Sequence, residues 1–334
     1  MLYSDTVSKK IGNLRVPLYV VWSLTYRCNQ RCLYCQIWKT KRQELNTRDV
    51  FRIIDELSSL GTKAICFSGG EPLLRDDLGI IINHALKAGI ACIDINSNGS
   101  LVKERIGDIK DIRLLCLSLD GPQRVHDRIR GKGAYRKVVE AARIAKKYKI
   151  TVYFRTVLTK YNLAYTQAVL NLADTMNIKV IFQPVTTSIY GTCHSHDLSA
   201  SQDDIRDTVR GLLSEKKKGA SAISSPQEVL DYLIKWPKTK RIHCISERMF
   251  FHLGPDGKFY PCAWEKDLKT IDRVDALKLG VLRAIKELPE SDCNGCNNTS
   301  SLEFIYRLSG LMNTHDNGRR KGCLKGDRNI TCCD

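Results

Sequence analysis

Three cysteines in one short loop have the spacing of metal-cluster ligands. Cys28, Cys32 and Cys35 lie in the run S-L-T-Y-R-C-N-Q-R-C-L-Y-C, which gives the pattern C-x3-C-x2-C. Iron–sulfur clusters are normally ligated by four cysteine thiolates, and no fourth cysteine or histidine follows within reach of this loop. The loop therefore predicts a four-iron, four-sulfur cluster with one iron left open for chemistry.

A structural zinc site is the alternative that the spacing leaves open. Structural zinc is commonly held by two C-x2–4-C pairs that together supply four ligands. The next thiol after the loop, Cys66, falls inside an expected strand. The spacing favours an iron–sulfur cluster without excluding zinc.

Length and composition predict a cytoplasmic protein with a sizeable core. The chain has 334 residues, of which 43% are apolar, enough for one large domain and a smaller one. Its longest apolar run, residues 18–24, is too short to span a membrane, and the N-terminus lacks the apolar segment of a secretory signal. Fourteen clustered cysteines in such a chain indicate metal or redox work rather than disulfides.

The charge is strongly basic, with 53 lysines and arginines against 36 acidic residues and a net charge of +17. A surface for nucleic acid or another anion is one interpretation of this excess. No nucleic-acid-binding motif accompanies the charge. Solvated basic faces are the favoured interpretation, and nucleic acid is not expected as a partner.

Short β-rich runs alternate with amphipathic helical stretches in the first half of the chain. The expected strands are residues 18–24, 64–68, 90–96, 114–119, 152–158 and 180–185, and the expected helices are 47–60, 77–87, 134–147 and 163–176. This alternation predicts parallel βα units that coil into an open or closed barrel. Chemistry in such folds gathers at the loops after the strands, and the cysteine loop follows the first strand.

In the second half of the chain the alternation of strands and helices stops. A polar loop at 186–200 leads to a helix at 202–218. Ser225 as N-cap, Pro226 at the first helical position and Glu228 closing a capping box predict the start of another helix. From residue 242 we expect a hairpin, with strands 249–253 and 258–261 joined by the turn G-P-D-G, and a helix near 276–287. These changes predict a domain boundary near residue 240.

The run Gly69-Gly70-Glu71-Pro72 directly follows the second expected strand. Two glycines allow a ligand to approach the backbone closely, and the glutamate can accept a hydrogen bond from an ammonium group. Alone, these residues could form an ordinary turn. One βα unit after the cysteine loop, they predict a second part of the same site.

Together these motifs resemble the radical S-adenosylmethionine (radical SAM) superfamily, whose signature is the three-cysteine loop with an aromatic residue before the last cysteine, here Tyr34, and a following G-G-E run. The resemblance covers roughly residues 16–190 and implies a partial (β/α)6 barrel. It also implies that SAM chelates the open iron. Reduction of the cluster then cleaves SAM to a 5′-deoxyadenosyl radical, which abstracts a substrate hydrogen.

The resemblance implies roles for further residues. The G-G-E run would hold the methionine moiety, and Gln183 would border the adenine. Ser118 could instead be an ordinary strand residue and Arg130 a surface ion-pair partner. The positions implied to bind the cofactor are Tyr34, Gly69, Gly70, Glu71, Asn98, Ser118 and Arg130.

A second group of cysteines resembles the auxiliary-cluster module called twitch, the short form of the SPASM domain. The pattern is C-x12-G-x4-C followed by C-x2-C, formed by Cys244, Cys262, Cys293 and Cys296. Leu302 and Tyr306 stand where the full form has two further cysteines, so the resemblance implies one auxiliary [4Fe–4S] cluster. A zinc ribbon from the same four cysteines is the alternative.

We therefore expect an α/β protein with a partial (β/α)6 TIM-like barrel and a small C-terminal iron–sulfur domain. The expected function is radical SAM chemistry on a small-molecule or peptide substrate, with an electron donor such as flavodoxin or ferredoxin. An RNA-modifying radical SAM enzyme and a non-catalytic iron–sulfur or zinc protein are the alternatives. The expected divisions are a tail at 1–16, the radical SAM barrel at 17–190, a helical connector at 191–240, the twitch/SPASM-like domain at 241–300 and a tail at 301–334.

The other cysteines carry weaker expectations. Cys66, Cys92 and Cys116 fall in strands and are expected as core residues. Cys193 could donate a hydrogen atom or bind substrate, although an ordinary loop thiol is favoured. No role is assigned to Cys323, Cys332 and Cys333.

Overall fold

The computed structural model describes most of the chain up to residue 260 and parts of the remainder. Described are residues 14–185, 198–237, 248–260, 274–289, 296, 298, 299, 301–303 and 306, and the backbone of 188, 189, 192 and 193. Three of the four cysteines of the second group, Cys244, Cys262 and Cys293, lie outside this part, as do Cys323, Cys332 and Cys333.

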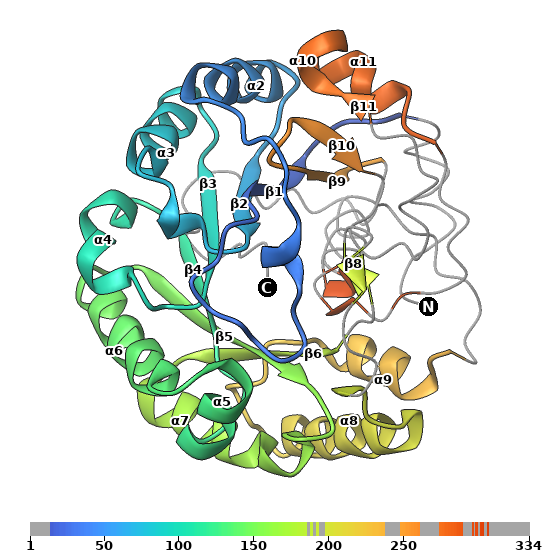
Figure 1. Cartoon of the computed structure of the whole chain (residues 1–334). Helices are drawn as coiled ribbons and strands as arrows, with labels where there is room; N and C mark the ends of the chain where they lie inside the picture. Colours follow the sequence, from blue (N-terminus) through green and yellow to red (C-terminus); the bar gives the residue numbers. More distant parts are fainter. Residues whose placement is uncertain are drawn as a thin grey trace, which may run out of the picture.

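Six parallel strands in sequential order form the barrel wall, as the alternating pattern predicts. Helices α2 to α7 curve around their outer side (Figure 1). The result is the predicted partial barrel. The strands are β1 (Tyr19–Thr25), β2 (Ala64–Gly69), β3 (Cys92–Ser97), β4 (Leu114–Ser118), β5 (Thr151–Leu158) and β6 (Lys179–Pro184), and the helices are α2 (Thr47–Ser59), α3 (Leu78–Lys87), α4 (Val102–Ile109), α5 (Gln123–Arg130), α6 (Ala134–Lys147) and α7 (Thr166–Met176).

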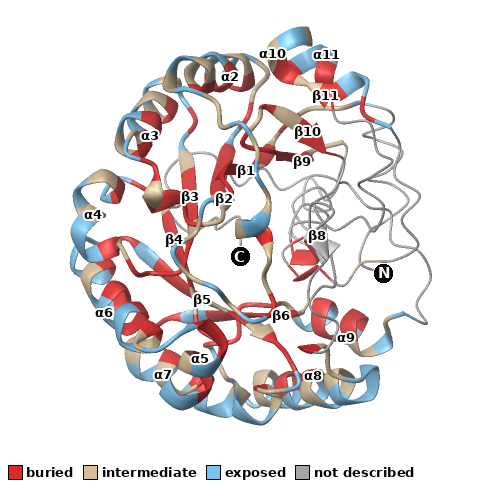
Figure 2. Ribbon diagram, viewed as in Figure 1, coloured by how far each residue is buried: buried red, intermediate tan, exposed pale blue. Residues whose placement is uncertain are grey.

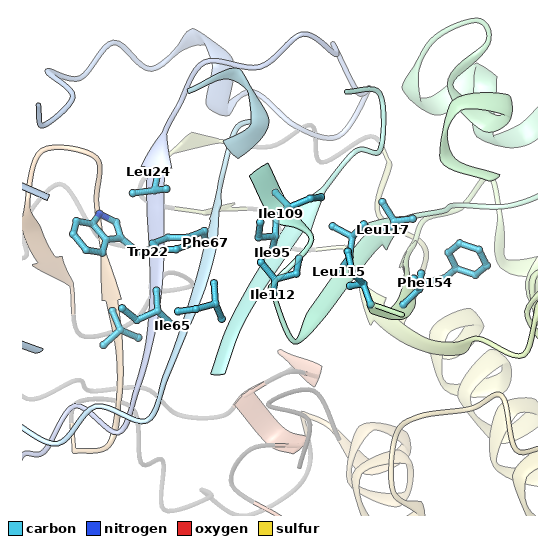
Figure 3. Close-up of a cluster of buried hydrophobic side chains, with 14 of the residues drawn as sticks. Trp22, Leu24, Ile65, Phe67, Ile95, Ile109, Ile112, Leu115, Leu117 and Phe154 are labelled. Carbon is cyan, nitrogen blue, oxygen red and sulfur yellow. The ribbon is translucent and has the colours of Figure 1, made fainter. Parts of the chain in front are cut away.

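Alternate side chains of each strand pack against these helices and form the main core. Trp22, Phe67, Leu115 and Phe154 are fully buried there. Figure 3 shows them in one row, with Ile95 of β3 between Phe67 and Leu115. Figure 2 shows the same division on the helices, whose buried residues turn toward the sheet and whose exposed residues turn outward. This burial follows from the period-two pattern of the strands and the 3.6-residue pattern of the helices.

The opposite face of the sheet carries a second, smaller set of buried side chains. Cys66 and Cys116 are buried there among Tyr19, Tyr153 and neighbouring residues. Cys92 is half-buried and packs against the same group. The core interpretation of these cysteines is therefore confirmed for Cys66 and Cys116.

The C-terminal hairpin joins the barrel sheet. Strands β9 (Phe250–Leu253) and β10 (Lys258–Tyr260) pair antiparallel, as predicted, and β11 (Val274–Asp275) pairs with β10. Strand β9 runs parallel to β1, with Tyr19 opposite Phe250, so one sheet holds nine strands in the order β11-β10-β9-β1-β2-β3-β4-β5-β6. A domain that begins at residue 241 stays a prediction, because the described strands after that point extend the barrel sheet.

Helix ends differ from expectation in two places. Helix α8 (Gln202–Lys217) agrees, but α9 (Gln227–Lys235) has no side-chain cap, because the Ser225 hydroxyl donates to the buried Glu303 instead. The predicted cap at Ser225 is therefore wrong. Gly280, with φ 78°, divides the helix expected near 276–287 into α10 (Ala276–Leu279) and α11 (Val281–Lys286).

In the described part of the chain, no helix has the length and apolar character that crossing a membrane requires.

Candidate active site

The cysteine loop begins where β1 ends, at the carboxyl edge of the sheet. In Figure 1 the segment between β1 and α2 crosses the front of the barrel. Cys28, Cys32 and Cys35 are half-buried free thiols, and a short 3-10 helix, Ile37–Lys39, follows them. The loop thus lies where a parallel βα fold places its chemistry.

Gly69, the last residue of β2, and Gly70, which follows it, allow the backbone of this loop to come close. The amide of Gly70 donates to the carbonyl of Thr25 at 2.8 Å, and the amide of Glu71 donates to that of Arg27 at 2.9 Å. A Cβ on Gly69 would lie 2.2 Å from the Thr25 oxygen, and one on Gly70 would lie 2.1 Å from the Arg27 oxygen. The close approach that the sequence predicted is thus made in the structure by the protein's own backbone.

One buried arm connects Glu71 to Cys28 through Asn98. The Glu71 carboxylate accepts from the backbone amide of Asn98 at 2.7 Å and from the Ser97 hydroxyl at 2.9 Å. The Asn98 side-chain amide then donates to the Cys28 sulfur at 3.9 Å and to Asn29 Oδ1 at 2.8 Å. Glu71 therefore fixes the turn after β3, and that turn holds the first cysteine.

Burial raises the pKa of Glu71 to about 7, against the lowering effect of these hydrogen bonds. Taking a carboxylate out of water disfavours its charged form. The Glu71 carboxyl therefore changes its protonation near neutral pH, although it has no exposed surface.

A second buried arm connects Asp120 to Cys32 through Arg130. Asp120 Oδ2 accepts from Arg130 Nε at 2.5 Å and from the Tyr34 hydroxyl at 3.1 Å, while Oδ1 accepts from the amide of Val157 at 2.9 Å. Arg130 Nη1 donates to the Cys32 sulfur at 3.8 Å, and the guanidinium also donates to the Tyr34 hydroxyl. Arg130 is 7% exposed and Asp120 is fully buried, so the alternative of a surface ion pair for Arg130 is wrong.

The charge of Arg130 is secured by this arm. Burial lowers its pKa, but the negative charge of Asp120 and the neighbouring Tyr34 hydroxyl raise it by more, so the pKa stays well above its ordinary value. A buried ion pair is stable only when its remaining hydrogen-bonding groups are satisfied. Tyr34 and Val157 supply that for Asp120.

Burial favours the protonated form of all three thiols. Burial raises the pKa of Cys32 to about 12 and also raises the pKa values of Cys28 and Cys35. A metal that binds must displace those protons. Within the described residues, no three His, Cys, Asp or Glu side chains converge on a single-ion position.

Ser118 and Gln183 stand apart from the two arms. Ser118 ends β4, is half-buried, and its hydroxyl makes no hydrogen bond within the described part of the chain. It is therefore open to a ligand at the carboxyl edge. Gln183 Oε1 accepts from the amide of Thr299 at 2.7 Å and its Nε2 donates to the Pro184 carbonyl at 3.0 Å, so this side chain links β6 to the C-terminal segment.

Of the second cysteine group, the structure describes Cys296. Its sulfur accepts from the amide of Asn298 at 3.3 Å, and its own amide donates to the Tyr232 hydroxyl at 3.3 Å. Thr299 is bonded to Gln183 in turn. Cys296 is therefore held close to the end of β6, the last strand of the barrel wall.

Sequence reasoning missed Asp120, the buried centre of the second arm. It stands in the run Ser118-Leu119-Asp120-Gly121, directly after β4 and two residues after a position that was singled out. The available signal was its position: Asp120 is an acidic residue just after a strand. The next element along the chain, α5, contains several arginines. Its partner, Arg130, had been singled out by resemblance alone.

Comparison with known protein families decides the identity of the barrel. The family model described as the radical SAM superfamily matches residues 22–173, from β1 to α7. These residues form a radical SAM domain. With its two enzyme relatives below, the protein is a radical SAM enzyme, so the alternative of a non-catalytic iron–sulfur or zinc protein is set aside.

Two curated radical SAM relatives show which reactions occur among similar chains. The PqqA peptide cyclase of Rhodopseudomonas palustris is 28% identical over 283 residues, which cover 80% of this chain and 72% of the relative. The Fe-coproporphyrin III synthase of Methanosarcina barkeri is 32% identical over 220 residues, which cover 63% of this chain. The aligned region spans about half, 54%, of that second relative.

Solved structures confirm the radical SAM fold. SuiB of Streptococcus suis bound to the precursor peptide SuiA superposes with a TM-score of 0.69 at 14% identity, covering 85% of this chain and 68% of SuiB. The native anSMEcpe structure with bound AdoMet gives 0.66 at 17% identity, covering 91% of this chain and all of that one. At these identities the likeness shows the fold alone.

Proposed function

We propose that this radical SAM enzyme holds a [4Fe–4S] cluster on Cys28, Cys32 and Cys35 and modifies a peptide. The observation that carries the proposal is the pair of buried arms, which contact two of the three thiols from the turn after β3 and from the end of α5. When bound, the cluster and SAM supply a 5′-deoxyadenosyl radical that removes a hydrogen atom from the substrate.

Under this proposal, the residues at the carboxyl edge of the barrel sheet have two roles: some position the cysteines, and Ser118 binds SAM. Asn98 and Arg130 position the sulfurs of Cys28 and Cys32, and Tyr34 completes the arm of Arg130. The Ser118 hydroxyl, which has no partner within the described part of the chain, binds SAM. Gly69 and Gly70 keep the cysteine loop against the end of β2.

An auxiliary [4Fe–4S] cluster on Cys244, Cys262, Cys293 and Cys296 belongs to the same proposal. Four cysteines suffice for one fully ligated cluster. The contacts of Cys296 and Thr299 with α9 and β6 support a position close to the barrel. Such a cluster would accept an electron from the substrate radical, bind substrate or stabilise the fold.

A peptide is the favoured substrate because the PqqA peptide cyclase, a relative that aligns over most of this chain, acts on a peptide. The PqqA peptide cyclase aligns with 80% of the chain, whereas the coproporphyrin synthase aligns with 63%. The second candidate is a tetrapyrrole precursor from which an iron porphyrin is formed, favoured by the higher identity of 32%.

Iron content and SAM cleavage test the proposal together. The anaerobically reconstituted protein should contain about eight irons, and the Cys28/Cys32/Cys35→Ala variant about four. The parent should form 5′-deoxyadenosine when reduced with dithionite, and the variant should form none. Zinc in place of iron, or equal iron in both proteins, would contradict the cluster assignment.

Substrate binding separates the two candidates. If the protein makes an iron porphyrin, Fe-coproporphyrin III should bind as the product, with a shifted Soret band and saturable affinity, and short peptides encoded beside the gene should not displace it. A peptide substrate should instead raise 5′-deoxyadenosine formation above the level without substrate and acquire a mass change. Saturable binding of Fe-coproporphyrin III, with no stimulation by any of these peptides, would overturn the peptide proposal.

A further inference from the structure

The exposed side of the cysteine loop carries only positive charge. From Tyr26 to Gln43 the sequence has five basic residues and no acidic one. Arg27 pairs with Glu44 and Arg42 with Asp256. Arg31, Lys39 and Lys41 are exposed and form no ion pair in the described part of the chain.

Helix α5 and the loop after β5 extend this surface. The amide of Leu33 donates to the carbonyl of Ile129 at 2.9 Å, which joins the loop to the end of α5. Beside that contact, Arg128 lies 4.5 Å and Lys160 5.6 Å from the centre of the Tyr161 ring. Both cations are exposed and neither forms an ion pair with a described residue. We call Arg31, Lys39, Arg128 and Lys160, with the exposed Leu33, the basic patch.

Two arginines of the basic patch are held in place by aromatic rings. Arg31 lies 4.3 Å from the centre of the Trp38 ring and its Nη1 donates to the carbonyl of Cys28 at 2.6 Å. Arg128 is held by Tyr161 in the same way. A guanidinium stacked on a ring loses less side-chain entropy when it then binds a carboxylate.

This arrangement favours an acidic protein over RNA as the partner. Proteins that bind single-stranded nucleic acid stack bases on open aromatic faces. Cations lie over both rings here, with Lys39 5.4 Å from the Trp38 ring centre in addition to Arg31. The exposed Leu33, at 46%, adds the apolar contact that is common in protein interfaces.

We propose that the basic patch is the docking surface for a small acidic one-electron carrier protein that reduces the cluster. The inference rests on the proposed function, since it needs a cluster on the cysteine loop. Arg31 and Leu33 flank Cys32 in the chain, so a carrier seated there contacts the cluster loop directly. In this electron transfer, the reduced carrier loses one electron and the cluster gains it, and no bond is made or broken.

The test compares two charge reversals of equal size in the reconstituted enzyme, with reduced flavodoxin as the carrier. Lys39→Glu/Arg128→Glu alters the basic patch, whereas Lys87→Glu/Lys147→Glu alters exposed cations of α3 and α6. At low ionic strength the patch variant should be reduced roughly tenfold more slowly and should bind flavodoxin correspondingly more weakly. The control should behave as the parent, and added salt should narrow the difference.

Dithionite separates this inference from the proposed function. Dithionite needs no docking surface, so it should reduce parent, patch variant and control equally and support equal SAM cleavage. Equal reduction of all three by flavodoxin would overturn the docking surface. Loss of tRNA binding in the patch variant with unchanged flavodoxin kinetics would assign the surface to RNA instead. No SAM cleavage by the parent with dithionite would overturn the proposed function itself.

Discussion

At the scale of single residues, the side chains implied to touch the cofactor are found bracing the cysteines. Asn98 contacts the Cys28 sulfur and Arg130 contacts the Cys32 sulfur. Glu71 in turn accepts a hydrogen bond from the backbone amide of Asn98. The sequence pointed to these residues through their motifs. It could not show which atoms they contact, because each contact joins loops that follow different strands.

Asp120 and Arg130 should be strongly coupled to each other in their contributions to the free energy of unfolding. Arg130→Met leaves the buried Asp120 carboxylate without its cation and should lower the free energy of unfolding by about 3 kcal/mol. The double variant Asp120→Asn/Arg130→Met should recover part of that loss, because it buries no unpaired charge. Urea denaturation of both single variants and the double variant gives the coupling, and strictly additive losses would contradict a buried pair.

Glu71 should make stability depend on pH between its two pKa values. Its pKa rises from 4.5 to about 7 on folding, so the folded protein binds more protons than the unfolded chain in that window. The contribution of Glu71 is therefore lost as pH rises, by about 3 kcal/mol in total. Glu71→Gln removes this dependence.

The measurement is the free energy of unfolding of both proteins at about pH 4.5 and about pH 8. On going from the lower to the higher pH, the free energy of unfolding of the parent should fall relative to that of Glu71→Gln. A difference that is the same at both pH values would show that Glu71 titrates normally.

At the scale of elements, strands were predicted better than short helices. All six barrel strands lie within two residues of expectation, because buried β-branched runs are a strong local signal. Helices α4 and α5 were missed. Each has eight residues, and α5 carries apolar side chains only at Val125 and Ile129, so packing rather than periodicity defines it.

Gly70 should be intolerant of a side chain because of the loop it touches. The Cβ of Gly70→Ala would lie 2.1 Å from the Arg27 carbonyl oxygen, which forces the cysteine loop away from β2. We expect a loss of about 1–3 kcal/mol in stability and reduced iron incorporation. Gly107→Ala, inside α4 with no atom near its Cβ, is the control and should be neutral or stabilising. Equal iron content in the two variants would show that the glycine is dispensable.

At the scale of the whole molecule, the C-terminal part is built onto the barrel. The hairpin adds to β1, and the segment around Cys296 is tied to β6 through Gln183. The hairpin was predictable from its turn. Its parallel pairing with a strand more than 200 residues earlier was not, because no local pattern specifies such a contact.

Gln183 should control how firmly that segment is held. Gln183→Met leaves the buried amide of Thr299 without its acceptor, at a cost of about 1–3 kcal/mol. Hydrogen exchange in residues 296–303 should therefore become at least about fivefold faster. Gln167→Met, which removes an exposed side-chain bond on α7, should leave that exchange unchanged. Unaltered exchange in Gln183→Met would contradict the link.

The central claim is that the Cys28/Cys32/Cys35 loop holds a cluster with one iron open to SAM. The most direct measurement is the electron paramagnetic resonance spectrum of the dithionite-reduced protein in which Cys244, Cys262, Cys293 and Cys296 are all replaced by alanine. That variant retains the first cluster alone, and its reduced-cluster signal should shift when SAM is added. A cluster signal that SAM leaves unchanged would contradict the claim.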